Sequence, residues 1–298
     1  DLVALGTVCD VVKLIKYNRI FVKMGLEIIK QRKNKGIAEI IDNSNLRSTP
    51  TSSDLGFIIG PQLNAASRLD DSSLPSKLLL SNNLSEIQII AKKLILLNEK
   101  RKLIEDQVCE EAFKQADKQN NRNYILVYGH DWHNGVLGIV ASRIVNKFNK
   151  PTIVISFTNE IGIGSARSIS AVDIGNIILN AKNKKLLIGG GGHKMAAGLQ
   201  INLNLLDQFI VYLNNNTNNF SKLLFQKIEE FDSKLSVNEI NSNLLDILDQ
   251  MEPFGSGNLE PKFIIYDLKI DHVKILKDKH LLLQFQNDFS SNLRAICL

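Results

Sequence analysis

The chain has 298 residues, with 36 Lys and Arg against 31 Asp and Glu and a net charge of +5. Hydrophobic residues make up 44% of it, which is enough to build cores and excludes a mostly disordered chain. This length predicts about two domains, or parts of three. No apolar run reaches the ~18 residues of a membrane span, so we do not expect this chain to be a membrane protein. The mild positive charge permits a polyanionic partner without requiring one.

The cysteines Cys9, Cys109 and Cys297 lie far apart and form no CxxC pair. This spacing argues against a thiolate zinc site and against a disulfide scaffold, and it fits a reducing cytoplasm.

Both ends of the sequence have the pattern of a fragment. The chain begins at Asp1 inside an apolar run, 2–12, that lacks the layout of a signal peptide. It stops at Leu298, in the second strand of a hairpin predicted over 281–296 around a polar turn at 287–292. We therefore expect a piece of a longer protein.

Residues 1–84 alternate short apolar runs with turn clusters, and the pattern changes at 85–120, where Gly and Pro are absent. Apolar residues recur there with a seven-residue period that two charged residues, Arg101 and Glu111, interrupt. A helix of about 30 residues would be roughly 45 Å long. A bundle helix is one interpretation, and a rod connecting two lobes is the favoured one because the composition changes beyond it.

An α/β pattern follows the predicted rod. The expected strands are 124–128, 152–156 and 161–167, and the expected helices lie around 136–144 and from Val172 onward. We interpret residues 213–224 as a helix end plus linker. After Gln226 the pattern is mostly that of β-strands, with one helix near 244–251, which suggests a compact C-terminal barrel.

The strongest motif is Gly189–His193, four glycines followed by a histidine. Because glycine has no Cβ, backbone N–H groups can converge on an anion there. A helix expected from His193 would point its positive end at the same anion. The alternative is a flexible loop with a capping histidine, which is less favoured because four glycines are costly in chain entropy. The candidate residues are Gly190, Gly191, Gly192 and His193.

A second motif, Gly164–Ser168, falls at the end of a predicted strand. Residues two apart on a strand share a face, so Ser165 and Arg167 would present a hydroxyl and a guanidinium side by side to a phosphate. In isolation, the simpler interpretation of the motif is an ordinary edge strand.

A third motif, His130–Gly135, holds the single Trp of the chain. Trp132 could stack on a base and His133 could donate to a phosphate. Packing of Trp132 over the edge of a domain is an equally good interpretation.

Two further motifs are weaker. In Gly60–Asp71, Asn64 and Arg68 are four residues apart and share one face of a short helix. In Gly6–Asp10, Asp10 closes an apolar run, where a carboxylate can hold a divalent ion or simply cap the segment.

Taken in order, these segments resemble the RecJ family of single-strand-specific DNA exonucleases in the DHH phosphoesterase superfamily. The matching stretches are 1–12, 60–71, 132–141, 164–168, 189–198 and 252–258, the last of which looks specific to this family. It implies an α/β fold with the C-terminal part of a DHH domain at 1–84, a connecting helix at 85–120, a DHH-associated domain at 121–218 and a truncated oligonucleotide-binding (OB) domain at 219–298.

The resemblance implies 5′-to-3′ hydrolysis of single-stranded DNA by two Mn²⁺ or Mg²⁺ ions, in DNA repair and recombination. By resemblance, Asp10 is a metal ligand, Ser165 and Arg167 recognise the 5′ phosphate, and His193 with its glycines binds phosphate. Asn64 and Arg68 match a segment that lines the catalytic cleft. The catalytic candidates are therefore Asp10, Asn64, Arg68 and His193, and the substrate-binding candidates are Trp132, His133, Ser165, Arg167, Gly190, Gly191 and Gly192. Single-stranded DNA is the expected partner, with single-strand-binding protein and a helicase as candidate protein partners.

The sequence departs from the family in two respects. The family's earlier Asp and His metal motifs have no match here, so we expect residues 1–298 to hydrolyse nothing by themselves. Gln62 and Ser67 stand where the family has Arg and Gly. Two alternatives stay open, a single-stranded nucleic-acid-binding protein that has lost catalysis and a phosphodiesterase of small oligonucleotides.

Overall fold

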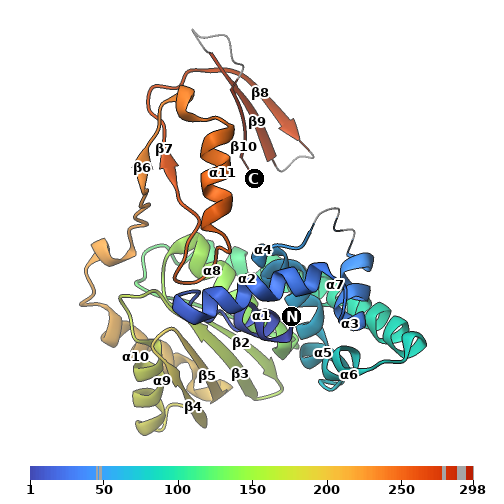
Figure 1. The fold of residues 1–298 in the computed structure, drawn as a ribbon. Helices are drawn as coiled ribbons and strands as arrows, with labels where there is room; N and C mark the ends of the chain where they lie inside the picture. The colour runs from blue at the N-terminus through green and yellow to red at the C-terminus, as the bar shows by residue number, and fades with distance from the viewer. Residues whose placement is uncertain (45, 47–48, 277–279, 287–292, 298) are drawn as a thin grey trace. The chain divides into compact units, whose positions relative to one another are not determined.

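The computed structural model describes residues 1–44, 46, 49–276, 280–286 and 293–297 (Figure 1). The chain divides into two compact units. The first unit contains Asp1 and residues 27–228, and the second contains residues 2–26 and 229–298.

The first unit begins with short helices packed on the N-terminal half of a long one. The short elements are α3 (Lys35–Asn43), α4 (Ser52–Asp54), a π-helical turn (Leu55–Ile59), α5 (Gly60–Leu69) and α6 (Leu74–Leu80). The long helix, α7 (Leu84–Asp117), has 34 residues, about 51 Å at 1.5 Å per residue. It contacts α3, α5 and α6 as well as α8 and β1. The long helix predicted from the lack of Gly and Pro is confirmed, and it joins these short helices to the sheet.

The sheet of the first unit has five strands in the order β1-β2-β3-β5-β4. The strands are β1 (Ile125–His130), β2 (Thr152–Thr158), β3 (Ile161–Arg167), β4 (Gly189–His193) and β5 (Ala196–Asn202). Strands β1 and β2 are parallel and are connected through α8 (Asn134–Phe148), whereas the remaining pairs are antiparallel. The three strands predicted from the sequence are confirmed within about two residues at each end.

The helix predicted from His193 is wrong. Residues 189–193 form the edge strand β4, which turns directly into β5. Four glycines carry no side-chain pattern, so pairing with β5 and packing on α9 (Ile174–Asn183) decide their structure. After the turn, Ala197, Leu199 and Ile201 are buried in alternation, which is the period of a strand and not of a helix.

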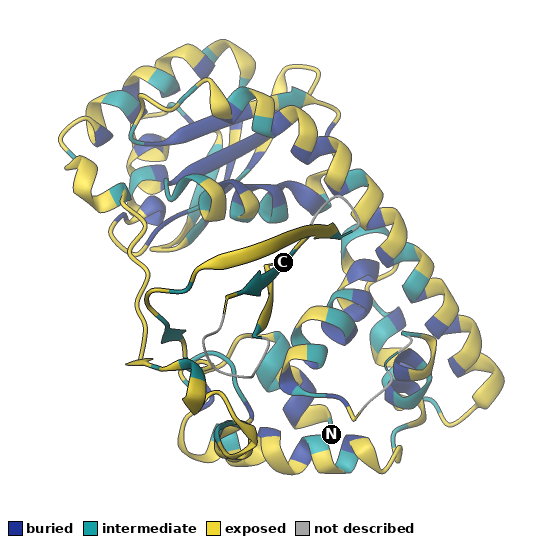
Figure 2. Cartoon of the chain, turned by 90° about the horizontal axis from the view of Figure 1, so that it is seen from above, coloured by how far each residue is buried: buried dark blue, intermediate teal, exposed yellow. Residues whose placement is uncertain are grey.

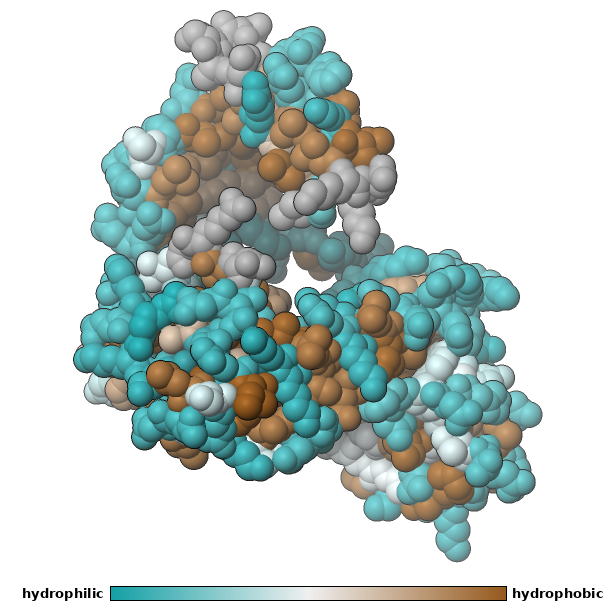
Figure 3. Space-filling view, turned by 90° about the vertical axis from the view of Figure 1, so that its right-hand side faces the viewer, coloured by the Kyte–Doolittle hydropathy of each residue, from teal (hydrophilic) through white to brown (hydrophobic). Residues whose placement is uncertain are grey.

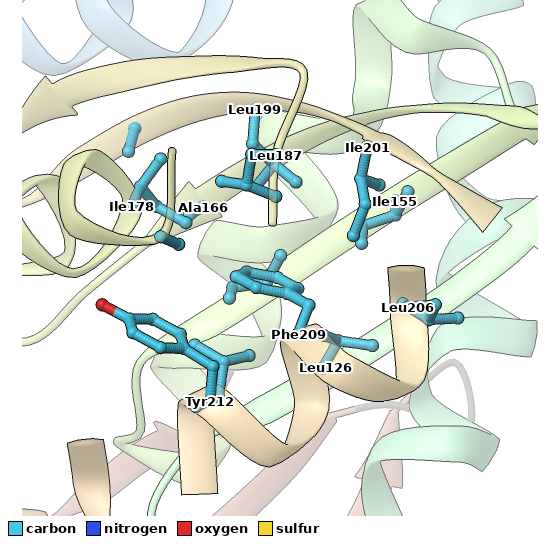
Figure 4. Packing of buried hydrophobic residues seen from close by; sticks show 14 of the residues in the cluster. Leu126, Ile155, Ala166, Ile178, Leu187, Leu199, Ile201, Leu206, Phe209 and Tyr212 are labelled. Atoms are coloured by element: carbon cyan, nitrogen blue, oxygen red, sulfur yellow. The ribbon is translucent and has the colours of Figure 1, made fainter. Parts of the chain in front are cut away.

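Successive residues of the strands point to two hydrophobic cores on opposite faces of the sheet. On one face, α9 and α10 (Leu206–Thr217) cover a cluster in which Phe209 and Tyr212 of α10 meet Leu126, Ile155 and Ile201 (Figure 4). On the other face, α8 and the C-terminal half of α7 cover Ile125, Val127 and Val154. Strand β2 and the first half of β1 are therefore buried on both sides, whereas β3 and β5 alternate buried residues with more accessible ones. The outward faces of the helices are exposed (Figure 2).

Two short 3₁₀ turns complete the first unit, Leu203–Leu205 and Lys222–Phe225. The second of these begins in the segment expected as a linker.

The second unit combines N-terminal helices with the C-terminal strands. Its helical elements are α1 (Leu2–Cys9), most of α2 (Lys16–Lys30), a 3₁₀ turn (Val237–Glu239) and α11 (Ser242–Met251). Its strands are β6 (Ser233–Lys234), β7 (Phe263–Ile264), β8 (Ile270–Leu276), β9 (His280–Phe285) and β10 (Arg294–Cys297). They form a two-stranded sheet, β6-β7, and a three-stranded antiparallel sheet, β10-β9-β8.

The predicted C-terminal hairpin is confirmed in its two strands, β9 and β10, while its expected turn at 287–292 lies outside the described residues. Strand β8 is exposed along nearly its whole length, and the described residues of this unit form two separate small sheets that do not close into a barrel (Figure 2).

The face drawn in Figure 3 is mostly hydrophilic and carries separate apolar patches. Among the described residues, no helix has the length and apolar character needed to cross a membrane.

Candidate functional site

Ser165 and Arg167 lie on the face of β3 that meets α8. Nη1 of Arg167 donates a hydrogen bond to Ser165 Oγ at 3.1 Å and another to the carbonyl oxygen of Ala166 at 2.9 Å. Helix α8 passes this pair at Gly138, where an added Cβ would lie 2.8 Å from Arg167 Nη2 and 3.2 Å from Ser165 Oγ. A glycine in α8 therefore leaves the space that the guanidinium occupies.

Arg68 reaches the same place from the last turn of α5. Its Nη1 donates to the carbonyl oxygen of Gly135, in the first turn of α8, at 2.8 Å. A Cβ at Gly135 would lie only 2.5 Å from the backbone oxygen of Arg68, so α5 and α8 approach each other at main-chain distance. Burial lowers the pKa of Arg167, and the positive charge of Arg68 lowers it further. The two guanidinium groups are thus close enough to repel each other.

A buried carboxylate on α7, that of Glu105, acts electrostatically on Arg68. Glu105 is 1% exposed and forms ion pairs with Arg101 and, at 2.6 Å, with Arg143. Burial lowers the pKa of Arg68, Arg101 lowers it further, and Glu105 partly opposes this effect. One carboxylate therefore serves several arginines. Within the described part of the chain, neither Arg68 nor Arg167 forms an ion pair with a carboxylate. Positive charge is in excess here, which favours an anionic ligand.

The sheet register extends this site toward the glycine-rich strand. Arg167 on β3 lies opposite Ala196 on β5, and Ala196 lies opposite His193 on β4. Residues directly opposite each other point to the same face. Because neighbouring strands are about 4.8 Å apart, His193 is about 10 Å from Arg167 across the sheet. The backbone pairing therefore brings a guanidinium and an exposed imidazole to one face.

The next row across the sheet joins Ser165, Gly198 and Gly191. An added Cβ at Gly191 or Gly198 would meet nothing within 4 Å, so the surface between Arg167 and His193 is open. Gly190 and Gly192 are in close contact with their neighbours. A Cβ at Gly190 would lie 2.8 Å from Ile178 on α9, and one at Gly192 would lie 2.3 Å from the backbone oxygen of Ala196. Gly191 thus belongs to the open surface, while Gly190 and Gly192 allow close packing.

His133 and Trp132 precede α8 and differ in role. His133 is the exposed N-cap of α8, and its Nδ1 accepts a hydrogen bond from the N–H of Gly135 at 3.1 Å. Neutral His133 then carries its proton on Nε2, which is a hydrogen-bond donor toward solvent. Trp132 is buried, and its Nε1 donates to Glu111 Oε2 at 2.9 Å. The structure does not support base stacking by Trp132, because its ring is part of the core.

Two other candidates are Asn64 and Asp10. Asn64 is exposed on α5, one turn before Arg68. Asp10 belongs to the second unit, where it is exposed after α1, and its N–H donates to the carbonyl oxygen of Gly6. The apolar run before it forms a helix in which only Ala4 and Leu5 are buried.

The residues that the structure describes bring together no group of three or more His, Cys, Asp or Glu that could hold a metal ion. One carboxylate does not make a two-metal centre, so the described residues do not by themselves fit the metal pair that the resemblance implies.

Sequence reasoning missed three positions at this site: Gly138, Arg101 and Glu105. A signal for Arg101 was available, because it is one of the two charged residues that interrupt the seven-residue pattern of α7, whereas Glu105 lies outside that pattern. Gly138 had no local signal, since its importance comes from contact with β3.

Comparisons with known proteins agree with this fold. A DHHA1 domain model matches residues 121–219 and a RecJ OB domain model matches residues 231–297. The single-stranded-DNA-specific exonuclease RecJ of Haemophilus influenzae is 38% identical over 275 residues, which cover 88% of this chain and 48% of the relative. The chain is homologous to RecJ.

Two crystal structures of RecJ from Thermus thermophilus resemble the fold. The structure in complex with Mn²⁺ has a TM-score of 0.87 at 27% identity, covering 99% of this chain and 43% of that one. The structure in complex with Mg²⁺ has a TM-score of 0.85 at 27% identity, covering 98% and 45%. The chain therefore spans about half the length of the RecJ proteins that it matches.

Proposed function

We propose that this chain is the DNA-holding part of a metal-dependent exonuclease that degrades single-stranded DNA from the 5′ end. The observation that carries the proposal is the pair of half-buried guanidinium groups, Arg68 and Arg167, that have no carboxylate partner among the described residues. The homology to RecJ supports the substrate class.

In this proposal, Arg167 and Ser165 bind the 5′ phosphate. Because Arg167 Nη1 already donates to Ser165 Oγ, the hydroxyl proton of Ser165 is free to be donated to a phosphate oxygen. Nε and Nη2 of Arg167 have no protein partner within the described residues, so they can donate to a second oxygen. Arg68 adds a second positive charge beside them.

The following part of the strand would lie on the open glycine surface. Gly191 and Gly198 let the sugar–phosphate backbone approach the sheet closely, and His193 borders the surface two strands from Arg167. His133 contributes its Nε2 proton at the start of α8. We assign Asn64, one turn before Arg68 on α5, to the same binding site.

Mn²⁺ or Mg²⁺ would supply the activation of water and the stabilisation of the leaving oxygen. The solved RecJ complexes with these ions support this choice. Asp10 is our candidate for one ligand, and no step of hydrolysis is derived from the residues of this chain alone.

The proposed division of the chain is a DHH part at 1–84, a connecting helix at 85–120, a DHH-associated domain at 121–218 and an OB part from 219. Single-strand-binding protein, a helicase and a cytoplasmic location stay predictions.

The test compares 5′-phosphorylated and 5′-hydroxyl oligonucleotides in a binding assay. We expect the wild-type chain to prefer the phosphorylated end and Arg167→Ala to lose that preference, because the guanidinium fork is removed. Arg122→Ala, which removes an exposed arginine of the same unit, is the matched control and should keep the preference. Equal loss of affinity for both ends in Arg167→Ala would refute the phosphate role.

The alternative of a binding protein without catalysis makes the same binding prediction. The two differ in hydrolysis by the complete gene product with Mn²⁺, which only the exonuclease shows. A small-oligonucleotide phosphodiesterase is less favoured, because the RecJ OB domain match covers residues 231–297.

A further inference from the structure

The second unit contains a basic pocket that the proposed function does not use. The pocket has a volume of about 500 Å³ and is lined by Lys16, Arg19, Ile20, Lys23 and Gln250. Four of these residues come from α2 and the fifth comes from the end of α11. Both elements belong to the same unit over these residues.

Hydrogen bonds hold the two walls of the pocket together. Nη2 of Arg19 donates to the carbonyl oxygen of Met251, the last residue of α11, at 2.7 Å. Nδ2 of Asn258 donates to the same oxygen at 3.1 Å, and the N–H of Leu14 donates to the carbonyl oxygen of Ser256 at 2.6 Å. The turn after α11 is thereby attached to the start of α2, so the pocket is part of the folded structure.

The positive charge of the pocket is not neutralised. Within the described residues, no ion pair joins Lys16, Arg19 or Lys23 to a carboxylate. The carboxyl group of Glu252, which follows α11, interacts with other carboxylates. Burial raises the pKa of Glu252, and the charges of Asp249 and Glu260 raise it further. A cation close to Glu252 would act in the opposite direction, so the α2 cations stay available for an external anion.

The cations are arranged as a row. Lys16, Arg19 and Lys23 follow one another at intervals of three and four residues, which places them on one stripe of α2. The row is about 10.5 Å long, since each residue adds 1.5 Å. Stacked nucleotides rise about 3.4 Å each, so the row spans about three nucleotide steps.

Aromatic side chains are exposed on the same helix. Tyr17 is 74% exposed and Phe21 is 51% exposed, and around the helix Ile20 lies between them and the row of cations. Aromatic side chains beside a basic groove let bases stack while the cations hold the backbone. The amide of Gln250 adds a donor and an acceptor for the edge of a base.

We propose that this face of α2, together with the end of α11, is a second binding site for single-stranded nucleic acid. Lys16, Arg19 and Lys23 bind successive phosphates, and Tyr17 and Phe21 stack on bases. The inference rests on the single-stranded-DNA substrate proposed above, but it concerns residues that are separate from the 5′-phosphate site.

The test measures binding of a 20-nucleotide oligo(dT) with a 5′ hydroxyl to the full chain and to Lys16→Ala/Lys23→Ala. Removing two phosphate contacts should lower the slope of log affinity against log salt by about 1.4, and affinity at 0.15 M salt by about tenfold. The matched control is Lys100→Ala/Lys102→Ala, which removes two exposed lysines of α7 and should change the slope much less. Circular dichroism and thermal unfolding check that both variants fold.

A loss no larger than that of the control, or an unchanged salt slope, would overturn the proposal. So would an acidic peptide of equal charge that competes as well as oligo(dT), because the site would then recognise charge alone. Tyr17→Leu/Phe21→Leu should reduce the preference for single-stranded over double-stranded DNA, and an unchanged preference would refute the stacking role.

The two proposals fail separately. If Arg167→Ala abolishes the preference for a 5′ phosphate while the Lys16 and Lys23 variant binds like its control, only the second site is refuted. If the wild-type chain shows no affinity for single strands, the proposed function fails as well.

Discussion

Replacement of Gly138 by alanine separates the stability of the fold from recognition of the phosphate. The added Cβ would lie 2.8 Å from Arg167 Nη2 and 3.2 Å from Ser165 Oγ. An ordinary van der Waals contact is at least 3.4 Å, so the guanidinium must move by about 0.6 Å or more. Both contacted atoms are ends of side chains, so the backbone can stay in place and the guanidinium rotates away from its present direction.

The expected changes have opposite signs. Alanine inside a helix is more favourable than glycine by up to about 1 kcal/mol, so the free energy of unfolding should stay the same or rise slightly. A hydrogen bond to a charged group is worth about 1.5–3 kcal/mol, and losing one at this half-exposed site should weaken binding of the 5′ phosphate about tenfold.

The assay combines urea unfolding with the affinity for 5′-phosphorylated and 5′-hydroxyl oligonucleotides. Gly6→Ala in α1 is the matched control, because an added Cβ there meets nothing within 4 Å. Gly6→Ala should raise the free energy of unfolding through its higher helix propensity, without changing the preference for a 5′-phosphorylated end. A Gly138→Ala protein that folds normally and keeps the full preference would refute the geometric reasoning at Arg167.

Three further predictions follow from contacts in the first unit. Gly192→Ala should destabilise the fold by more than about 1 kcal/mol in urea unfolding, because its added Cβ would lie 2.3 Å from a backbone oxygen. Gly191→Ala should fold normally and weaken oligonucleotide binding. The reverse order of stabilities would contradict the assigned packing. Trp132→Phe removes the hydrogen bond to Glu111 and should cost about 1–3 kcal/mol of stability with no change in affinity, whereas a loss of affinity at unchanged stability would restore the stacking role. Glu105→Gln leaves Arg101 and Arg143 without their shared carboxylate and should cost about 3 kcal/mol or more, and a thermal unfolding temperature equal to that of the wild type would contradict it.

Local sequence patterns predicted the elements that have a side-chain period. The strand at 161–167 was predicted at its observed bounds, and the long helix was predicted within three residues of α7. The same period-two argument placed Ser165 beside Arg167, and their 3.1 Å hydrogen bond confirms that they are neighbours. Their role in phosphate binding stays a prediction.

The elements that sequence reasoning missed are those determined by distant parts of the chain. The glycines of β4 carry no pattern, and their strand exists because β5 pairs with them and α9 packs on them. The approach of Arg68 to Gly135 joins residues 67 positions apart, which no local spacing could indicate. The sequence alone does not decide between the two interpretations of Trp132, because burial of its ring depends on α7, where Glu111 accepts a hydrogen bond from the indole N–H.

The charge arrangement on α5, α7 and β3 supports the proposed binding site over a purely structural network. A network that serves stability alone pairs its buried cations, as Glu105 does for Arg101 and Arg143. Arg167 has no such partner among the described residues: burial lowers its pKa, and the positive charge of Arg68 lowers it further. An unpaired like-charge pair is unfavourable for folding, and an anion bound between the two groups would remove the repulsion. Repulsion between Arg68 and Arg167 lowers the stability of the fold, and a bound phosphate would offset it. This is the physical reason to place the phosphate between the two guanidinium groups.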